Sequence, residues 1–186
     1  MGKILEIVEL GHPILRERAS EVENLEDREV QSFIDDLIET GIDSNGVGIA
    51  APQVNEAKRI FIISSRSNVR YPNAPELGPV AIVNPEITHF SEEKVKDWEG
   101  CLSIPGIRGL VSRHKTIKVK YQTRNGEDVE NEFSDFIARI FQHELDHLNG
   151  IVFVDRMKSS LEIVTEKEYQ RLITKEMEER DLEKED

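Results

Sequence analysis

Residues 134–150, SDFIARIFQHELDHLNG, contain the pattern that decides the fold. Apolar side chains recur there every three or four residues, which is the spacing of a helix with one buried face. We therefore predict a central helix from about Ser134 to Leu148, with Gly150 placed where the residue beyond a helix C-terminus belongs. The apolar positions are Phe136, Ile137, Ile140, Phe141, Leu145 and Leu148.

The sequence on either side of the central helix predicts further helices and short strands. Helical spacing predicts an N-terminal helix from about Asp27 to Ile42, and a C-terminal helix that starts near Ser159 or Ser160. The last helix runs into an acidic helical tail from about residue 175, KEMEERDLEKED, whose charges are typical of a solvated helix end. The β-type runs are RIFIIS (59–64), VAIVN (80–84), TIKVKYQ (116–122) and IVFVDR (151–156).

Together these elements predict an α+β fold. We expect antiparallel β-strands packed around the central helix that carries His-Glu-x-x-His, with an N-terminal helix and a C-terminal helix. Asn125-Gly126 suits a tight turn, so TRNGED (123–128) is expected to close a hairpin. No repeat or composition shift marks a second unit, so residues 1–186 are expected to form a single domain.

Composition excludes several classes of protein. The net charge is −13, from 24 basic and 37 acidic residues, and it opposes direct binding to a nucleic-acid backbone. No apolar run approaches the roughly 20 residues of a membrane-spanning helix, and the start MGKILEIVEL lacks the features of a signal peptide. We therefore expect a cytoplasmic protein with no membrane partner. The single cysteine, Cys101, cannot form an intrachain disulfide and needs another explanation.

The motif His-Glu-x-x-His has a geometric consequence on a helix. His143 and His147 lie one turn apart on the same face, so both imidazoles can reach one metal ion. Glu144 points to the side of that ion, where its carboxylate can act on water as a general acid/base. Surface or core histidines are the ordinary alternative. A catalytic site of this kind needs a third ligand from the protein.

Three arrangements that could supply the third ligand can be tested against the sequence. One protease motif continues with a histidine six residues after His147, but Phe153 stands at that position. Another protease class uses a later glutamate, and Glu162 or Glu166 is loosely eligible, although a polar helix face contains glutamates anyway. Cys101 is the stronger candidate, with a small buried core residue as its alternative explanation.

Three segments taken together resemble the bacterial-type peptide deformylases. They are Gly46-Val47-Gly48-Ile49-Ala50-Ala51-Pro52-Gln53, Glu99-Gly100-Cys101-Leu102-Ser103 and Gln142-His143-Glu144-Leu145-Asp146-His147. With φ for an apolar residue, they match the family patterns GφGφAAxQ, EGCφS and QHEφDH in order and without a substitution. The resemblance covers about residues 5 to 160, and it includes the C-terminal helix and the acidic tail only loosely.

The resemblance implies a metal-dependent hydrolase that removes the formyl group from the N-terminal formyl-methionine of new polypeptides and releases formate. Cys101, His143 and His147 would hold one divalent ion, usually Fe²⁺, with Zn²⁺ and Ni²⁺ also able to occupy the site. The softness of these ligands alone would suggest zinc just as well. The implied catalytic groups are Glu144, the Gln53 side-chain amide and the Leu102 backbone N–H. The implied partners are N-formylmethionyl peptides near the ribosome.

The resemblance also implies a set of residues that contact the substrate. Backbone at Gly46 and Gly48 would approach the extended peptide closely. Val47, Phe136 and Ile140 would form an apolar pocket for the methionine side chain, with plain core packing as the alternative. The expected substrate-binding residues are Gly46, Val47, Gly48, Glu99, Gly100, Phe136 and Ile140.

Polar residues in and near the three motifs are expected to pair with one another or to support the metal ligands. Asp146 is expected to form a buried ion pair with Arg113 or Arg108, and Glu99 and Gln142 are expected to orient the metal ligands. The alternative function is a zinc-dependent endopeptidase of the His-Glu-x-x-His type, which would need a third ligand after His147.

Overall fold

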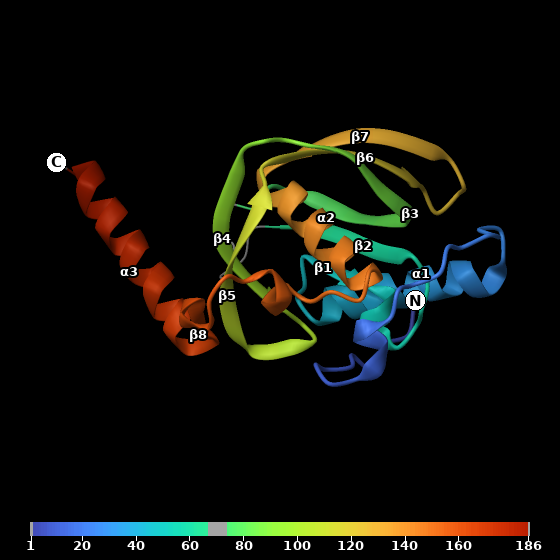
Figure 1. Cartoon of the computed structure of the whole chain (residues 1–186), viewed down its shortest axis with the longest axis horizontal. Helices are drawn as coiled ribbons and strands as arrows, with labels where there is room; N and C mark the ends of the chain where they lie inside the picture. Colours follow the sequence, from blue (N-terminus) through green and yellow to red (C-terminus); the bar gives the residue numbers. More distant parts are fainter. Residues whose placement is uncertain (1, 67–73, 186) are drawn as a thin grey trace.

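The described residues form two antiparallel sheets with helices packed against them (Figure 1). The computed structural model describes residues 2–66 and 74–185, and side chains as far as residue 175. The helices are α1 (Arg28–Asp43), α2 (Asp135–Leu148) and α3 (Glu166–Glu185). The strands are β1 (Gly48–Ala50), β2 (Ile60–Ser65), β3 (Leu77–Phe90), β4 (Lys94–Cys101), β5 (Ile104–His114), β6 (Thr116–Gln122), β7 (Asp128–Ser134) and β8 (Ile163–Thr165). Short 3-10 helices are η1 (Pro13–Arg16), η2 (Ala51–Val54), η3 (Phe153–Arg156) and η4 (Ser160–Glu162).

The strand order is β1-β2-β3-β6-β7 in the larger sheet and β4-β5-β8 in the smaller one. This mixed fold, with antiparallel sheets and three helices in the described part of the chain, confirms the α+β prediction at that level. The first helix forms where its apolar spacing predicts, because the Asp27 side chain accepts a hydrogen bond from the Glu29 N–H at 2.8 Å and caps the helix. Strand β6 coincides with TIKVKYQ.

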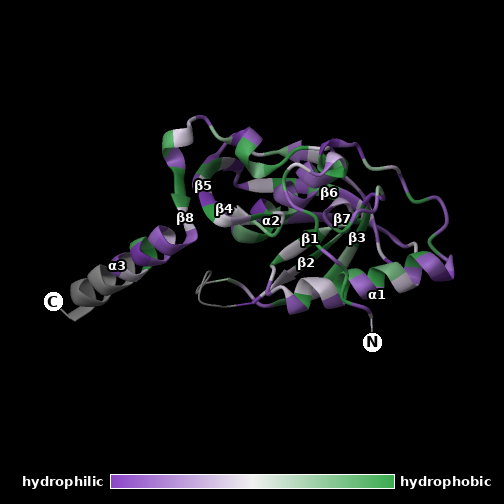
Figure 2. Cartoon of the chain, turned by 90° about the horizontal axis from the view of Figure 1, so that it is seen from below, coloured by the Kyte–Doolittle hydropathy of each residue, from purple (hydrophilic) through white to green (hydrophobic). Residues whose placement is uncertain are grey.

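The larger sheet has a helix on each face because successive side chains of a strand point to opposite sides. Phe61 of β2 packs edge to face on Phe141 of α2, with ring centroids 5.1 Å apart. Its neighbour Ile62 belongs to a different buried cluster, together with Ile34 and Leu37 of α1. Hydrophobic and hydrophilic residues alternate in bands along α1 (Figure 2), as expected for a helix with one buried face. Because α2 also contacts β5, residues of both sheets meet around it.

The prediction of a strand at IVFVDR is wrong. Residues Phe153–Arg156 form the 3-10 helix η3 instead. The Asp155 carboxylate accepts a hydrogen bond from the Val152 N–H at 2.9 Å, which closes a turn, and Val152 and Phe153 are buried beneath the smaller sheet's residues Ile104 and Val111. Burial of apolar side chains therefore explains the hydrophobic run without strand pairing.

The predicted start of the C-terminal helix is also wrong. Ser159 caps only the short η4, where its hydroxyl accepts a hydrogen bond from the Leu161 N–H. Strand β8 follows and pairs with β5, so α3 begins only at Glu166. From there α3 extends away from both sheets (Figure 1), and the charged side chains predicted for the tail after residue 175 lie outside the described side chains.

The hairpin predicted at TRNGED forms between β6 and β7, with Gln122 paired to Asp128. Gly126 has the expected positive φ angle of 80°, but Asn125 does not, because five residues rather than two connect the strands. None of the described helices is both long and apolar enough to cross a bilayer.

Candidate metal centre

The three side chains predicted to share a metal ion come together in the structure. Cys101 is the last residue of β4, whereas His143 and His147 lie one turn apart on α2. One ligand atom from each of the three residues lies within 4.8 Å of the other two. The Cys101 Sγ is 3.2 Å from the His147 Nε2, and the centroids of the two imidazole rings are 5.1 Å apart. Both histidines are buried, and Cys101 is partly exposed.

The chemistry of these donors fits one divalent transition-metal ion. A thiolate and two imidazoles are ligands for zinc, iron and nickel. The His143 Nδ1 lies 2.9 Å from the Glu99 carboxylate, which leaves its Nε2 for the side of the metal. Without metal, burial opposes a charge on His143, but hydrogen bonds with Cys101 and Glu99 hold its pKa well above the ordinary value. A cation among the three donors would take the place of that proton.

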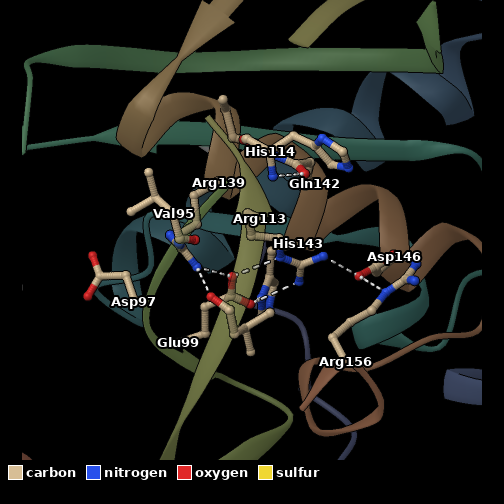
Figure 3. A network of polar contacts seen from close by, with 12 residues as sticks. Val95, Asp97, Glu99, Arg113, His114, Arg139, Gln142, His143, Asp146 and Arg156 are labelled. Carbon is tan, nitrogen blue, oxygen red and sulfur yellow. Dashed lines mark hydrogen bonds and ion pairs between the residues drawn. The ribbon is translucent and has the colours of Figure 1, made fainter. Parts of the chain in front are cut away.

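Glu99 is itself held by two buried arginines (Figure 3). The Arg113 guanidinium donates two hydrogen bonds to this carboxylate, both 2.9 Å long, and Arg139 donates one of 2.8 Å. Burial acts to raise the pKa of Glu99, but the charge and hydrogen bonds of Arg113 outweigh burial and hold the pKa far below its usual range. Glu99 is therefore a fixed negative charge that orients the His143 ring.

The network continues from Arg113 to Asp146, at 2.6 Å. Arg113 was one of the two partners expected for Asp146. The other, Arg108, pairs with Glu166 instead, at 2.7 Å. The expectation that Gln142 orients a metal ligand is wrong, because its side-chain amide is bonded to the backbone N–H and C=O of His114, at 3.1 Å and 2.8 Å.

We expect Asp146→Asn to lower the free energy of unfolding by roughly 2 kcal/mol, because the buried Arg113 loses one of its two carboxylate partners and keeps only Glu99. Asp146 is buried and accepts hydrogen bonds from both Arg113 and Arg156. Urea unfolding measures the difference. Arg156→Gln is the matched control: the Arg156 side chain is 46% exposed, so its loss should have an effect of about 1 kcal/mol or less. Equal stability of the Asp146→Asn protein and its parent would show that the pair is not structural.

Glu144 lies beside the three donor residues and is buried, with 4% of its surface exposed. Its Oε2 atom has no hydrogen-bond partner among the described residues. Burial raises the pKa of Glu144 to about 7, against the opposing charges of His143 and Arg113. A carboxyl group poised near neutral pH can both accept and return a proton.

Gly48 of β1 leaves the space that the Glu144 carboxylate occupies. A Cβ on Gly48 would lie 2.3 Å from the Glu144 Oε1, which is far inside any permitted contact. The sequence suggested that this glycine lets the substrate approach. The structure adds a second reason for a glycine here: any side chain at position 48 would collide with the carboxylate of Glu144, the candidate acid/base.

We expect Gly48→Ala to displace the Glu144 carboxylate and to lower kcat by roughly a hundredfold, while metal content stays at the parent level. The rate of formate release, which is the activity that the three motifs imply, and elemental analysis give the two quantities. Gly78→Ala is the control, because a Cβ there meets nothing within 4 Å. A Gly48→Ala enzyme as fast as the Gly78→Ala enzyme would contradict this steric role.

Two hydrogen-bond donors stand beside Cys101. The Gln53 Oε1 accepts a hydrogen bond from the Ala50 N–H at 2.9 Å, so the amide turns its NH₂ group toward the Cys101 Sγ at 3.4 Å and the Ser103 Oγ at 3.2 Å. Leu102 is the first residue of a two-residue turn between β4 and β5, so its N–H lies outside the ladder that pairs these strands.

A cavity of about 230 Å³ opens on this group of residues. Every residue that the sequence assigned to catalysis or substrate binding lines it, and so do Cys101 and His143. His147 is not among the lining residues and is 1% exposed.

Sequence reasoning missed other lining residues, among them Trp98, Arg108, Arg139 and Glu166. Arg139 had a detectable signal, because it stands four positions before His143 and therefore shares a helix face with that ligand. Arg108 and Glu166 were considered only in other roles, as a partner of Asp146 and as a third ligand. Their pairing gave no signal, because 58 positions separate them in the chain and only the fold brings them together.

Three donors for a metal ion beside a buried carboxyl group, open to a cavity, define the class of metal-dependent hydrolases. The comparisons with known proteins narrow this class. The chain matches the polypeptide deformylase family over residues 4–162. It is 54% identical over 173 residues to Peptide deformylase 2 of Nostoc sp., an alignment that covers 93% of this chain and 97% of that protein.

Solved structures agree with this match. The class I type b peptide deformylase of Acinetobacter baumannii, solved with Met-Ala-Ser bound, has a TM-score of 0.82 and 48% sequence identity, over 84% of this chain and 100% of that one. A peptide deformylase from Synechococcus elongatus, in complex with actinonin, has a TM-score of 0.76 and 35% identity, over 85% of this chain and 81% of that one.

The chain belongs to the peptide deformylase family. This membership confirms the resemblance drawn from the three motifs, and it supports an enzymatic deformylase function over the endopeptidase alternative.

Proposed function

We propose that this chain hydrolyses the formamide of N-formylmethionyl peptides, releasing formate and a free amino terminus. The observation that carries the proposal is the convergence of Cys101, His143 and His147 within 4.8 Å, beside the buried Glu144 and on one cavity. A hydrolase needs such donors together with a proton-transfer group next to the reacting bond.

In this proposal Cys101, His143 and His147 hold one divalent ion. The ion supplies Lewis-acid chemistry, which makes water more acidic and polarises a carbonyl group. We assign Fe²⁺ from the family resemblance, and Zn²⁺ or Ni²⁺ suits the same donors. Glu99 supports the site by orienting His143 through a contact of 2.9 Å.

Glu144 acts as the general acid/base. It takes a proton from the attacking water and delivers it to the departing amine nitrogen, so that the C–N bond breaks without leaving an amide anion. Its buried position and the unpartnered Oε2 support this role, because nothing among the described residues competes for that oxygen.

Gln53 and Leu102 stabilise the negative charge that develops on the formyl oxygen. The Gln53 amide is held by Ala50 with its NH₂ group toward Cys101, which supports a donor role toward that oxygen. The Leu102 backbone N–H is the second donor. Removing one such donor in other hydrolases raises the barrier by roughly 3–4 kcal/mol.

The substrate occupies the cavity with its methionine side chain against apolar residues. Val47, Phe136 and Ile140 all line the cavity, which supports this placement. Gly46 and Gly48 let the extended peptide backbone approach. The related enzyme from Acinetobacter baumannii was solved with Met-Ala-Ser bound, so a relative of this fold accepts a peptide of the size of the expected product.

We also infer that residues 1–186 act as one catalytic unit, since β4, β5, α2 and α3 all supply residues to the cavity. We place the reaction in the cytoplasm, where a reducing environment preserves a thiol ligand and formylated polypeptides emerge from the ribosome.

Formate release tests the proposal directly. The protein is purified anaerobically, its metal is measured by elemental analysis, and it is incubated with formyl-Met-Ala-Ser. We expect formate in amounts equal to the Met-Ala-Ser formed, and Fe²⁺ near one ion per chain. Met-Ala-Ser without the formyl group should remain intact. Cleavage of its internal peptide bonds, with no formate from the formylated peptide, would establish an endopeptidase.

A further inference from the structure

One wall of the cavity comes from the C-terminal helix. Glu166, the first residue of α3, lines the same cavity as Glu144 and Cys101, and so does Arg108 of β5. The Glu166 carboxylate accepts a hydrogen bond of 2.7 Å from the Arg108 Nε and a second, of 3.5 Å, from its Nη2. Residue 166 lies just beyond the segment 4–162 that matches the family model, in the C-terminal part of the chain.

Arg108 is confined from several sides. Its side chain is 4% exposed, whereas that of Glu166 is 31% exposed. The guanidinium carbon lies 5.0 Å from the centre of the Tyr169 ring, one turn further along α3. On its other side it rests against Gly100, where a Cβ would lie 2.8 Å from the same carbon atom. The guanidinium therefore fills the space between α3 and the residue that precedes Cys101.

The first turn of α3 is anchored at this position by two further contacts. Strand β8 precedes it directly and lies beside β5 (Figure 1). In this pairing Arg108 stands opposite Val164. The Tyr169 ring meets Trp98 of β4 with centroids 5.9 Å apart. Although the rest of α3 extends away from the sheets, its first turn is thus part of the cavity wall.

We propose that Glu166 is a positioning residue for Arg108, and that the pair sets the preference of this enzyme for charge in the peptide beyond the formyl-methionine. The inference rests on the proposed function, because it concerns the substrate of that cavity. The Arg108 guanidinium and the Glu166 carboxylate carry opposite charges, and both line the cavity. Removing one of them changes the charge of the cavity wall by one unit, and removing the other changes it by one unit with the opposite sign.

The two removals therefore act in opposite directions. Glu166→Gln makes the wall more positive, which favours acidic substrate residues and disfavours basic ones. Arg108→Gln makes the wall more negative and has the reverse effect. Simple loosening of the cavity would weaken binding of acidic and basic peptides alike, so the opposite signs distinguish an electrostatic role from a structural one.

The experiment compares formyl-Met-Ala-Glu with formyl-Met-Ala-Lys, and formyl-Met-Glu-Ala with formyl-Met-Lys-Ala. The quantity measured is the ratio of kcat/KM for the acidic peptide to that for the basic peptide. We expect Glu166→Gln to raise this ratio in at least one pair by roughly threefold to tenfold, and Arg108→Gln to lower it by a similar factor. The change should fall on KM more than on kcat, because the charged residue is remote from the scissile bond.

Glu162→Gln is the matched control. It removes the same charge four residues earlier, from an ion pair with Lys96 of β4 that does not line the cavity. Its ratios should equal those of the parent. The proposal is overturned if Glu166→Gln leaves both ratios at the parent value, or if Glu166→Gln and Arg108→Gln shift them in the same direction.

Two further outcomes are separable. If Arg108→Gln does not fold, the Glu166→Gln ratios alone decide, since Glu166 is partly exposed and its variant keeps the shape of the side chain. If the parent enzyme releases no formate from any of the four peptides, the proposed function has failed. A parent that deformylates all four, with ratios insensitive to Glu166, defeats only the role of this pair.

Discussion

Glu144→Gln should lower kcat for formate release by roughly 10²- to 10⁴-fold and leave metal content near one ion per chain. The variant keeps the shape and burial of the side chain but removes the group that carries the proton. The parent carboxyl is buried, with a pKa raised to about 7, so it can cycle between its two protonation states near neutral pH. An amide cannot.

Formate release at saturating formyl-Met-Ala-Ser and elemental analysis of the same preparation measure the two quantities. Glu130→Gln provides a control, because Glu130 is an exposed partner of Lys120 across β6 and β7 and lies outside the cavity. Retention of metal together with turnover within tenfold of the parent would assign proton transfer to another group. Loss of metal would instead show that Glu144 helps to hold the ion.

The parts of the molecule that were predictable from sequence are those in which the signal is local. His143, Glu144 and His147 share one helix, so their spacing alone determines that they meet on or beside one face. The capped start of α1 and the alternating residues of β6 are local in the same sense. Cys101 lies 46 positions before His147, so spacing could not place it beside the histidines. It was the stronger candidate for the third ligand, and the family resemblance supported that choice.

The errors concern segments whose conformation depends on distant partners. IVFVDR has the composition of a strand, but its apolar residues are buried against β5 while Asp155 closes a turn. The segment after Ser160 keeps the apolar spacing of a helix, yet Ile163, Val164 and Thr165 are β-branched and form a strand by pairing with β5. The role of Glu166 shows the same dependence. From sequence it was a weak candidate ligand on a polar helix face, and in the structure it holds Arg108.

Cys101→Ala should lose both metal and formate release. With the thiol gone, two imidazoles remain, and two neutral ligands hold a divalent ion far more weakly than a set that includes a thiolate. Metal content by elemental analysis gives a direct measurement. Thermal unfolding gives a second that needs no substrate: added metal should raise the Tm of the metal-free parent and should not raise that of the variant.

Ser103→Ala is the control for this substitution, since Ser103 lies two residues beyond Cys101, in the turn that follows β4, is fully buried and accepts a hydrogen bond from Gln53. That variant should retain its metal and its metal-dependent rise in Tm. A Cys101→Ala protein with one tightly held ion would mean that the sulfur, although 3.2 Å from the His147 Nε2, is a neighbour of the site and not a ligand. The contrast between Cys101→Ala, without metal, and Glu144→Gln, with metal but without turnover, therefore separates the residues that hold the ion from the residue that moves the proton.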